Sequence, residues 1–140
     1  MEGALVAAAV LVAATVFGLI RRRRDGVLRA RGGDGDVSET LGSGDLGAEL
    51  GEKATLVQFS SAFCAPCRAT RRVLDEVATM LDGVAHVELD AEDHLDLVRR
   101  LNVLRTPTVL VLDGAGRIVR RAAGQPRRAD VIAALGTAIT

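Results

Sequence analysis

The chain has two cysteines, Cys64 and Cys67, in the run Phe63-Cys64-Ala65-Pro66-Cys67. A CXXC pair can cycle between dithiol and disulfide, with one thiolate attacking a substrate disulfide and the second resolving the mixed disulfide. We expect Cys64 to begin a helix, whose free N–H groups and positive dipole end lower the pKa of a thiol there. Arg68, one turn on, adds positive charge. Cys64 is therefore the predicted nucleophile and Cys67 the predicted resolving thiol.

Two other uses of the cysteines are less consistent with the sequence. A zinc site needs about four ligands, and the other soft candidates, His86 and His94, lack ligand spacing to the cysteines. A purely stabilising disulfide is also poorly supported, because the loop that Cys64 and Cys67 would close is small and its closure removes little entropy from the unfolded chain. We expect no metal and no cofactor other than the redox-active disulfide Cys64–Cys67.

The elements that must position this pair follow from hydrophobic periodicity. An apolar run with β-formers precedes the cysteines, and apolar residues at helical spacing follow them up to Gly83. We predict strands at 55–60, 84–90, 108–113 and 117–122, and helices at 64–81, 91–101 and 128–139. Strands separated by helices favour parallel pairing, so we expect an α/β fold with a mixed, mostly parallel central sheet and helices on both faces. A further short helix is predicted at 46–50.

Over residues 53–136 the chain resembles the thioredoxin family. The resemblance is carried by the strand VQFSS, the run FCAPC, the helix RATRRVLDEVA, the segment VELDAED and the later Thr106-Pro107-Thr108. It implies a thioredoxin fold in which Pro107 is a cis-proline opposite the cysteines, where the alternative is an ordinary trans proline at a strand start. It also implies that Phe63, Ala65, Pro66, Thr106 and Pro107 contact the substrate, with the Thr106 backbone pairing in strand fashion.

The chain departs from the family at two positions behind the cysteines. Family members carry a buried acid in the preceding strand, which assists proton removal from the second thiol, and commonly a lysine close to it. Here these positions are Gln58 and His86. Glutamine cannot take a proton near neutral pH, so His86 is a candidate replacement base. The alternative is a histidine that is hydrogen-bonded or at the surface.

Residues 1–24 have the pattern of a membrane anchor. The run 3–20 is uncharged and apolar, and as a helix it would span about 27 Å, against a bilayer core of about 30 Å. Arg21 to Arg24 follow the run, whereas a cleaved signal peptide has its basic segment before it. Because cytoplasmic flanks are rich in basic residues, we expect the N-terminus outside and the main domain in the cytoplasm.

The remaining composition limits the partners. Residues 25–51 are rich in Gly and Asp and predict a flexible linker, followed by a thioredoxin-like domain over 52–140. The formal net charge is zero, and the basic excess is confined to one short segment, which argues against a nucleic-acid partner. The expected partners are protein disulfides, an upstream reductant of unknown identity, and the lipid bilayer through residues 3–20.

Three functions are compatible with these patterns. The first is a thiol–disulfide oxidoreductase that reduces protein disulfides near the membrane. The second keeps the chemistry but places the domain outside the cytoplasm, in oxidative folding or haem-protein maturation. The third is a membrane-tethered scaffold without enzymatic activity, which loss of the buried acid would permit. The sequence does not decide the direction of electron flow.

Overall fold

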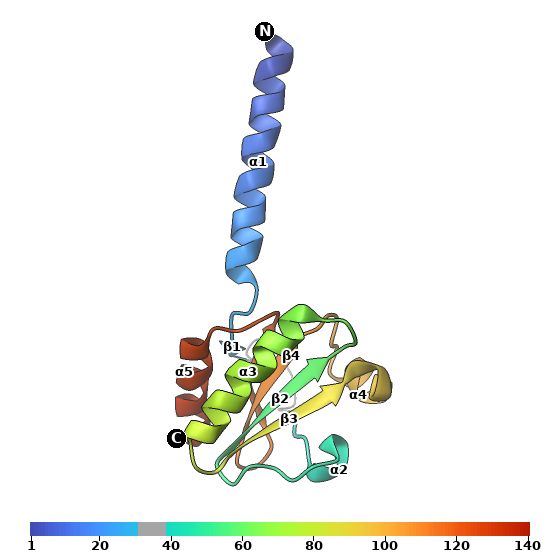
Figure 1. Cartoon of the computed structure of the whole chain (residues 1–140), viewed down its shortest axis with the longest axis vertical. Coiled ribbons are helices and arrows are strands. Elements are labelled where there is room, and N and C mark those ends of the chain that lie inside the picture. Colours follow the sequence, from blue (N-terminus) through green and yellow to red (C-terminus); the bar gives the residue numbers. More distant parts are fainter. Residues whose placement is uncertain (31–38) are drawn as a thin grey trace.

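The computed structural model describes residues 1–30 and 39–140. Helices and strands alternate along most of the chain, and Figure 1 shows a long N-terminal helix standing on a compact α/β domain. The elements are α1 (Glu2–Arg24), β1 (Arg29–Ala30), α2 (Ser43–Leu46), β2 (Ala54–Ser60), α3 (Ala65–Met80), β3 (Val84–Asp90), a 3₁₀ turn η1 (Ala91–Asp93), α4 (Leu95–Arg100), β4 (Thr108–Asp113), β5 (Ile118–Ala123) and α5 (Arg128–Ile139).

The strands form one sheet in the order β1-β5-β4-β2-β3. β2 pairs in parallel with β3, from Ala54 opposite Val84 to Ser60 opposite Asp90. The other pairings, β2 with β4, β4 with β5 and β5 with β1, are antiparallel. The α/β thioredoxin fold with a mixed sheet is confirmed, but the prediction that its strands are mostly parallel is wrong.

The orientation of β4 explains this correction. A parallel crossover must return the chain along the full length of a strand, which for the seven-residue β3 is about 23 Å. The connection over 91–107 instead folds into η1, the six-residue α4, which rises about 9 Å, and a loop that turns back to the same end of the sheet. The chain therefore enters β4 at the end of the sheet where it leaves β3, as the pairings Phe59–Thr108 and Ser60–Asp90 show.

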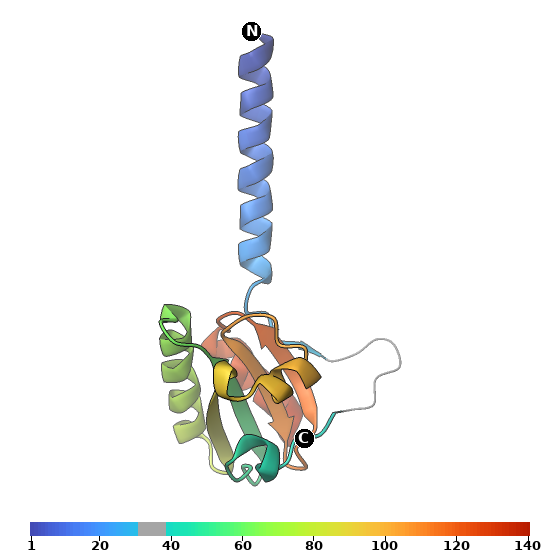
Figure 2. The same ribbon diagram turned by 90° about the vertical axis from the view of Figure 1, so that its right-hand side faces the viewer.

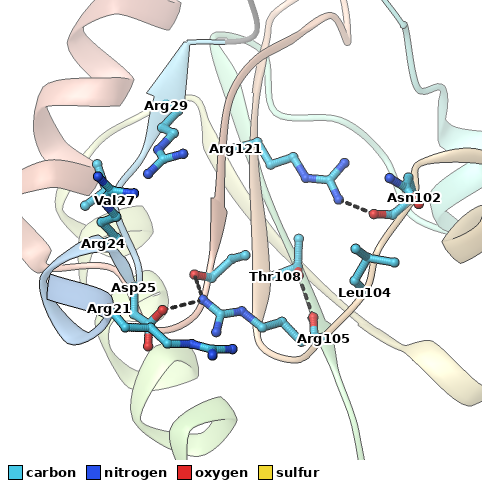
Figure 3. Close-up of a pocket in the computed structure, with 11 residues that line it drawn as sticks. Arg21, Arg24, Asp25, Val27, Arg29, Asn102, Leu104, Arg105, Thr108 and Arg121 are labelled. Carbon is cyan, nitrogen blue, oxygen red and sulfur yellow. Dashed lines mark hydrogen bonds and ion pairs between the residues drawn. The ribbon is translucent and has the colours of Figure 1, made fainter. Parts of the chain in front are cut away.

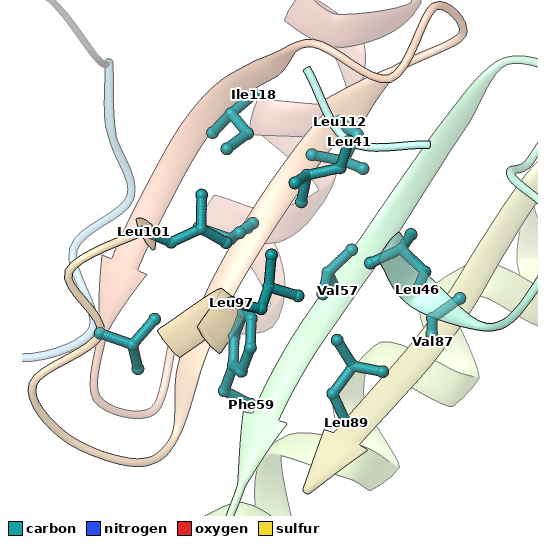
Figure 4. Packing of buried hydrophobic residues seen from close by; sticks show 12 residues of the cluster. Leu41, Leu46, Val57, Phe59, Val87, Leu89, Leu97, Leu101, Leu112 and Ile118 are labelled. Carbon is teal, nitrogen blue, oxygen red and sulfur yellow. The ribbon is translucent and has the colours of Figure 1, made fainter. Parts of the chain in front are cut away.

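Helices cover both faces of the sheet, and each face has its own hydrophobic core. Alternation along β2 sends Leu56 toward α3 and α5, and Val57 and Phe59 toward α4 and α2. Figure 4 shows the cluster on the α4 and α2 side of the sheet, with Leu97 of α4 close to Phe59. Because β2 is buried along its whole length, it is a rigid platform for the residues that follow it.

Two predicted helices differ in the structure. The segment predicted as a helix over 91–101 is split, because Asp90 accepts a hydrogen bond from the N–H of Glu92, which forms η1, and His94 then leaves helical geometry with φ −130° and ψ 44°. The helix predicted at 46–50 lies earlier, as α2. It ends because Gly47 adopts a left-handed conformation with φ +62°.

The helix α1 has the length and composition of a membrane span. It contains 23 residues, has a mean hydropathy of 2.5 over its most apolar window and has no buried side chain within the structure. A signal sequence near an N-terminus meets the same criteria. In both views α1 projects away from the domain, as Figure 2 makes plain.

The end of α1 is joined directly to the domain. The N–H of Gly26 donates to the carbonyl of Ala123 at 2.9 Å, and the guanidinium of Arg105 binds both this carbonyl at 2.7 Å and the Asp25 carboxylate at 2.8 Å (Figure 3). β1 then pairs with β5. Glycine is required at position 26, where φ is +73° and a Cβ atom would lie 1.9 Å from the Gln125 carbonyl oxygen. We call these contacts the junction clamp.

The range predicted as a flexible linker, 25–51, is therefore largely part of the domain. Its first residues form the junction clamp and β1, and Leu41 and Leu46 are buried in the core with 0% and 3% exposure. The apolar side chains among the Gly and Asp residues of this range account for the difference, since each can be buried against the sheet. The part of the predicted linker over 31–38 lies outside the described residues.

Candidate active site

The two cysteines lie where β2 passes into α3. They form a disulfide, with their Cα atoms 5.2 Å apart. Cys67 is 2% exposed, within the first turn of α3, whereas Cys64 at the N-cap is only half-buried. Cys64 is thus the sulfur that a second protein can reach, and Cys67 is protected behind it.

The N-terminus of α3 surrounds Cys64 with hydrogen-bond donors. The backbone N–H of Cys67 points at Cys64 Sγ at 3.2 Å. Pro66 occupies the first turn of the helix, where its missing N–H leaves no hydrogen bond unmade. A thiolate at Cys64 would gain from this N–H and from the positive end of the helix dipole. The location is suited to a nucleophilic sulfur.

Phe63 and the loop before β4 flank the half-buried sulfur. Phe63 has φ +60° and a fully exposed ring. The Thr106–Pro107 peptide bond is cis, as the resemblance implied. The hydroxyl of Thr106 lies 3.9 Å from Cys64 Sγ and shares a 2.7 Å hydrogen bond with the hydroxyl of Ser61. Segments some 45 residues apart in the sequence are thus held together at the disulfide.

Behind the disulfide lies a chain of hydrogen bonds that begins at Gln58. This side chain is fully buried and donates through Nε2 to the Cys67 carbonyl at 2.8 Å and to the Ser60 hydroxyl at 2.9 Å. Its Oε1 lies 3.2 Å from His86 Nε2, and His86 Nδ1 lies 2.5 Å from the Asp75 carboxylate. Both ring nitrogens of His86 thus face oxygen atoms, so the ring links Asp75 of α3 to Gln58 of β2.

Comparison with known proteins identifies the family. The sequence matches the family model described as Thioredoxin over residues 45–137. The chain belongs to the thioredoxin family. It is 33% identical over 79 residues to the thioredoxin of Alicyclobacillus acidocaldarius, covering 55% of this chain and 74% of that protein. It is 27% identical over 81 residues to the thioredoxin of Mycoplasma genitalium, covering 58% and 78% respectively.

Solved structures agree with this assignment. Chloroplastic thioredoxin z superposes with a TM-score of 0.56 at 27% identity, over 61% of this chain and 78% of that one. A mutant thioredoxin of Halobacterium salinarum superposes with a TM-score of 0.58 over 64% and 77%, and at 18% identity it shows the fold alone. Membership of the thioredoxin family, together with the Cys64–Cys67 disulfide, makes this chain a thiol–disulfide oxidoreductase.

As a thioredoxin-family site, this one differs in how the resolving cysteine is supported. Gln58 hydrogen-bonds to the carbonyl of Cys67, and within the described residues His86 reaches the cysteine only through the Gln58 amide. Because an amide side chain does not pass on a proton at neutral pH, the contact of His86 with this part of the site is limited to orienting the Gln58 side chain.

Three residues of the site were not anticipated from the sequence. They are Ser60, Ser61 and Asp75, each of which completes a hydrogen bond to a residue that was predicted. Asp75 could have been found, because position 75 lies on the α3 surface that faces β3, where His86 was expected. Ser60 could also have been found, because it lies two residues after Gln58 on the same side of β2. No signal points to Ser61, since its partner Thr106 depends on how the loop before β4 packs. Within residues 1–30 and 39–140, no cluster of three His, Cys, Asp or Glu side chains is placed to hold a metal ion.

Proposed function

We propose that this protein is a membrane-anchored disulfide reductase that acts on protein disulfides close to the membrane surface. The observation that carries the proposal is the difference between the two sulfurs, because a half-buried Cys64 at a helix N-terminus stands in front of a buried Cys67. The apolar helix α1 supports the anchor, with residues 3–20 in the bilayer. The Cys64–Cys67 couple is the only redox group that the proposal requires.

In the forward reaction the reduced pair delivers two electrons to a client disulfide. The Cys64 thiolate attacks one client sulfur, the client S–S bond breaks, and the departing thiolate takes up a proton. The Cys67 thiol then gives up its proton, and its thiolate attacks Cys64 Sγ, which releases the second client sulfur as a thiolate. The client leaves as a dithiol and the protein is left with the Cys64–Cys67 bond. An external dithiol donor must reduce that bond before the next cycle.

The loop before β4 supplies the binding part of the proposal. Within the described chain, neither the N–H nor the C=O of Thr106 has a hydrogen-bond partner. Both are free to pair with an extended client segment in the manner of an added strand. Phe63, Ala65 and Pro66 are exposed beside the disulfide and form the remaining contact surface, whereas Pro107 is buried and fixes the position of Thr106. Gln58 and His86 are proposed to assist loss of the Cys67 proton.

The test is reduction of insulin disulfides by the full chain in detergent, with dithiothreitol as the dithiol donor. We expect turnover that depends on Cys64. A rate no higher than that of a Cys64→Ser variant would overturn the proposal. Redox titration of the Cys64–Cys67 couple decides the direction, since a reductase should be close to thioredoxin at about −270 mV and an oxidant nearer −120 mV.

We also propose that the domain lies in the cytoplasm, because Arg21 to Arg24 follow the apolar run on the domain side. A phosphatase that is active only outside the cytoplasm, fused to the C-terminus, should be inactive. Strong phosphatase activity would instead place the domain outside, where the same chemistry would serve oxidative folding or haem-protein maturation.

A further inference from the structure

A groove beside the disulfide is lined by both the membrane helix and the domain. The last turn of α1 contributes Arg22, the loop before β4 contributes Arg105, Thr106 and Pro107, and Pro66 comes from between the cysteines. The segment that leads into α5 closes the groove with Gly124 to Arg128. We call this feature the arginine groove.

The arginine groove is lined mainly by positively charged side chains. Four arginines line it, Arg22, Arg105, Arg127 and Arg128, against a single carboxylate, that of Asp25. Asp25 is paired with Arg105 at 2.8 Å, and Arg128 is paired with Glu76 at 3.0 Å. In the described parts of the chain, no carboxylate lies within ion-pair distance of Arg22 or Arg127, and both are exposed. Two guanidinium groups are therefore available to a ligand.

Two residues that line the arginine groove, Pro66 and Thr106, adjoin the reacting Cys64. Pro66 lies between the two cysteines, and the hydroxyl of Thr106, in the same lining, lies 3.9 Å from Cys64 Sγ. An extended segment that pairs with the Thr106 backbone must therefore pass along the arginines. The residues that flank a client cysteine are the ones that reach Arg22 and Arg127.

The junction clamp holds Arg22, in the last turn of α1, at the arginine groove. Asp25 and Gly26 bind Arg105 and Ala123 immediately after the last turn of α1. Figure 3 shows this turn beside the domain, with the Asp25 to Arg105 ion pair between them. Arg22 is thus fixed as a wall of the groove by contacts that immediately follow α1.

We propose that the arginine groove selects client segments with acidic residues next to the disulfide. This inference rests on the proposed reductase function and names its substrate class. Guanidinium groups match carboxylates in geometry as well as charge, since each can form two parallel hydrogen bonds. Charges at the rim of an interface act mainly on the rate of encounter and on the choice of partner.

Binding and turnover are measured separately with the full chain in phosphatidylcholine nanodiscs. Three labelled peptides carry aspartate, glutamine or lysine beside a cysteine pair, and a second set has serine at the cysteine positions. For the serine set, fluorescence anisotropy should show about fivefold tighter binding of the acidic than of the glutamine peptide at low ionic strength. The same order should appear in kcat/KM for the disulfide set. Both preferences should fall below about twofold at ~1 M salt.

Single variants assign the preference to the groove. Arg22→Gln and Arg127→Gln should each reduce the acidic preference at least about twofold, and circular dichroism confirms that each variant is folded. Arg99→Gln is the matched control, because Arg99 is exposed on α4, on the other face of the sheet, and its replacement removes the same charge. It should keep the preference.

The outcomes separate the two proposals. Acid-selective binding without turnover would refute the reductase and leave the groove standing. Equal binding of the three peptides, or equal loss in Arg99→Gln and Arg127→Gln, would overturn the groove. If the preference disappears when phosphatidylglycerol is added to the nanodiscs, lipid headgroups occupy the arginines, and that result also overturns the inference.

Discussion

At the scale of single residues, the site depends on the unequal environments of two cysteines with the same chemistry. Cys64 is the half-buried N-cap of α3, and Cys67 is 2% exposed beneath it. The cysteine pair could be predicted from its place between a strand and a helix, and the role of Pro107 from the resemblance to the thioredoxin family. The hydrogen bond between Ser61 and Thr106 could not, since it joins loops whose contact depends on the whole sheet.

Gln58 stands where the family has a buried acid, and its amide still forms hydrogen bonds behind Cys67. Its Nε2 group is held by the Cys67 carbonyl and the Ser60 hydroxyl, which directs its Oε1 toward His86. Asp75 holds the opposite side of the imidazole. The His86 ring therefore bridges Asp75 and Gln58 and helps to hold the Gln58 amide against Cys67.

We expect His86→Asn to slow the resolving step about two- to tenfold, because Gln58 loses the ring that holds its amide oxygen while its nitrogen donates to the Cys67 carbonyl. Release of a self-quenched fluorescent peptide from its mixed disulfide measures the step. His94→Asn is the control, because the His94 ring contacts the Asp90 carbonyl at the end of β3. An unchanged rate in His86→Asn would mean that His86 does not support the resolving step.

At the scale of secondary-structure elements, the sequence predicts the ends of a helix or strand correctly where glycine or a change of polarity bounds it. The bounds of β3, β4 and α5 match their predicted ranges for this reason. The direction of β4 could not be predicted from alternation, which is the same for parallel and antiparallel strands. It is set by the way the connection over 91–107 packs, with η1, the break at His94 and the short α4 returning the chain to the same end of the sheet.

The turn between β4 and β5 depends on one carboxylate. Asp113 accepts hydrogen bonds from the N–H groups of Ala115 and Arg117, at 3.0 Å and 2.9 Å, and from the Arg117 guanidinium at 2.9 Å. Burial acts to raise the pKa of Asp113, but these hydrogen bonds prevail and hold it below its usual range. The charged form is thus the one that stabilises the hairpin.

We predict that Asp113→Asn lowers the free energy of unfolding by about 1–3 kcal/mol at pH 7. Because the pKa of Asp113 is depressed in the folded state, its contribution is complete above the unfolded value of about 3.9 and disappears as pH falls through the folded value. Urea unfolding followed by circular dichroism should show the two proteins converging at acidic pH. Asp82→Asn, at an exposed position, should change little. A constant difference across this range would contradict the assignment.

At the scale of the whole molecule, α1 and the active site lie at the same end of the domain. The junction clamp follows α1 directly and binds the loop that carries Thr106 and Pro107 through Arg105. The sequence suggests a flexible tether here, because Gly and Asp are typical of linkers. The close approach of Gly26 to Gln125 is a tertiary feature that composition does not encode.

We expect Gly26→Ala to release α1 from the domain, since the added Cβ atom would lie 1.9 Å from the Gln125 carbonyl oxygen. Amide hydrogen exchange over residues 25–30 should accelerate at least about tenfold, because the hydrogen bonds there open more often. Gly44→Ala is the matched control, with nothing within 4 Å of the new atom. Unchanged exchange at 25–30 in Gly26→Ala would show that the clamp does not hold α1.

The central claim is that Cys64 attacks and Cys67 resolves. The most direct measurement is trapping of the mixed disulfide, in which the reduced Cys67→Ser chain is mixed with a peptide disulfide and analysed by mass spectrometry. Since the half-buried Cys64 then has no resolving partner, a peptide adduct on Cys64 should accumulate. The Cys64→Ser chain should form little adduct, because its remaining cysteine, Cys67, is only 2% exposed. An adduct formed equally by both variants, or by Cys64→Ser alone, would contradict the account.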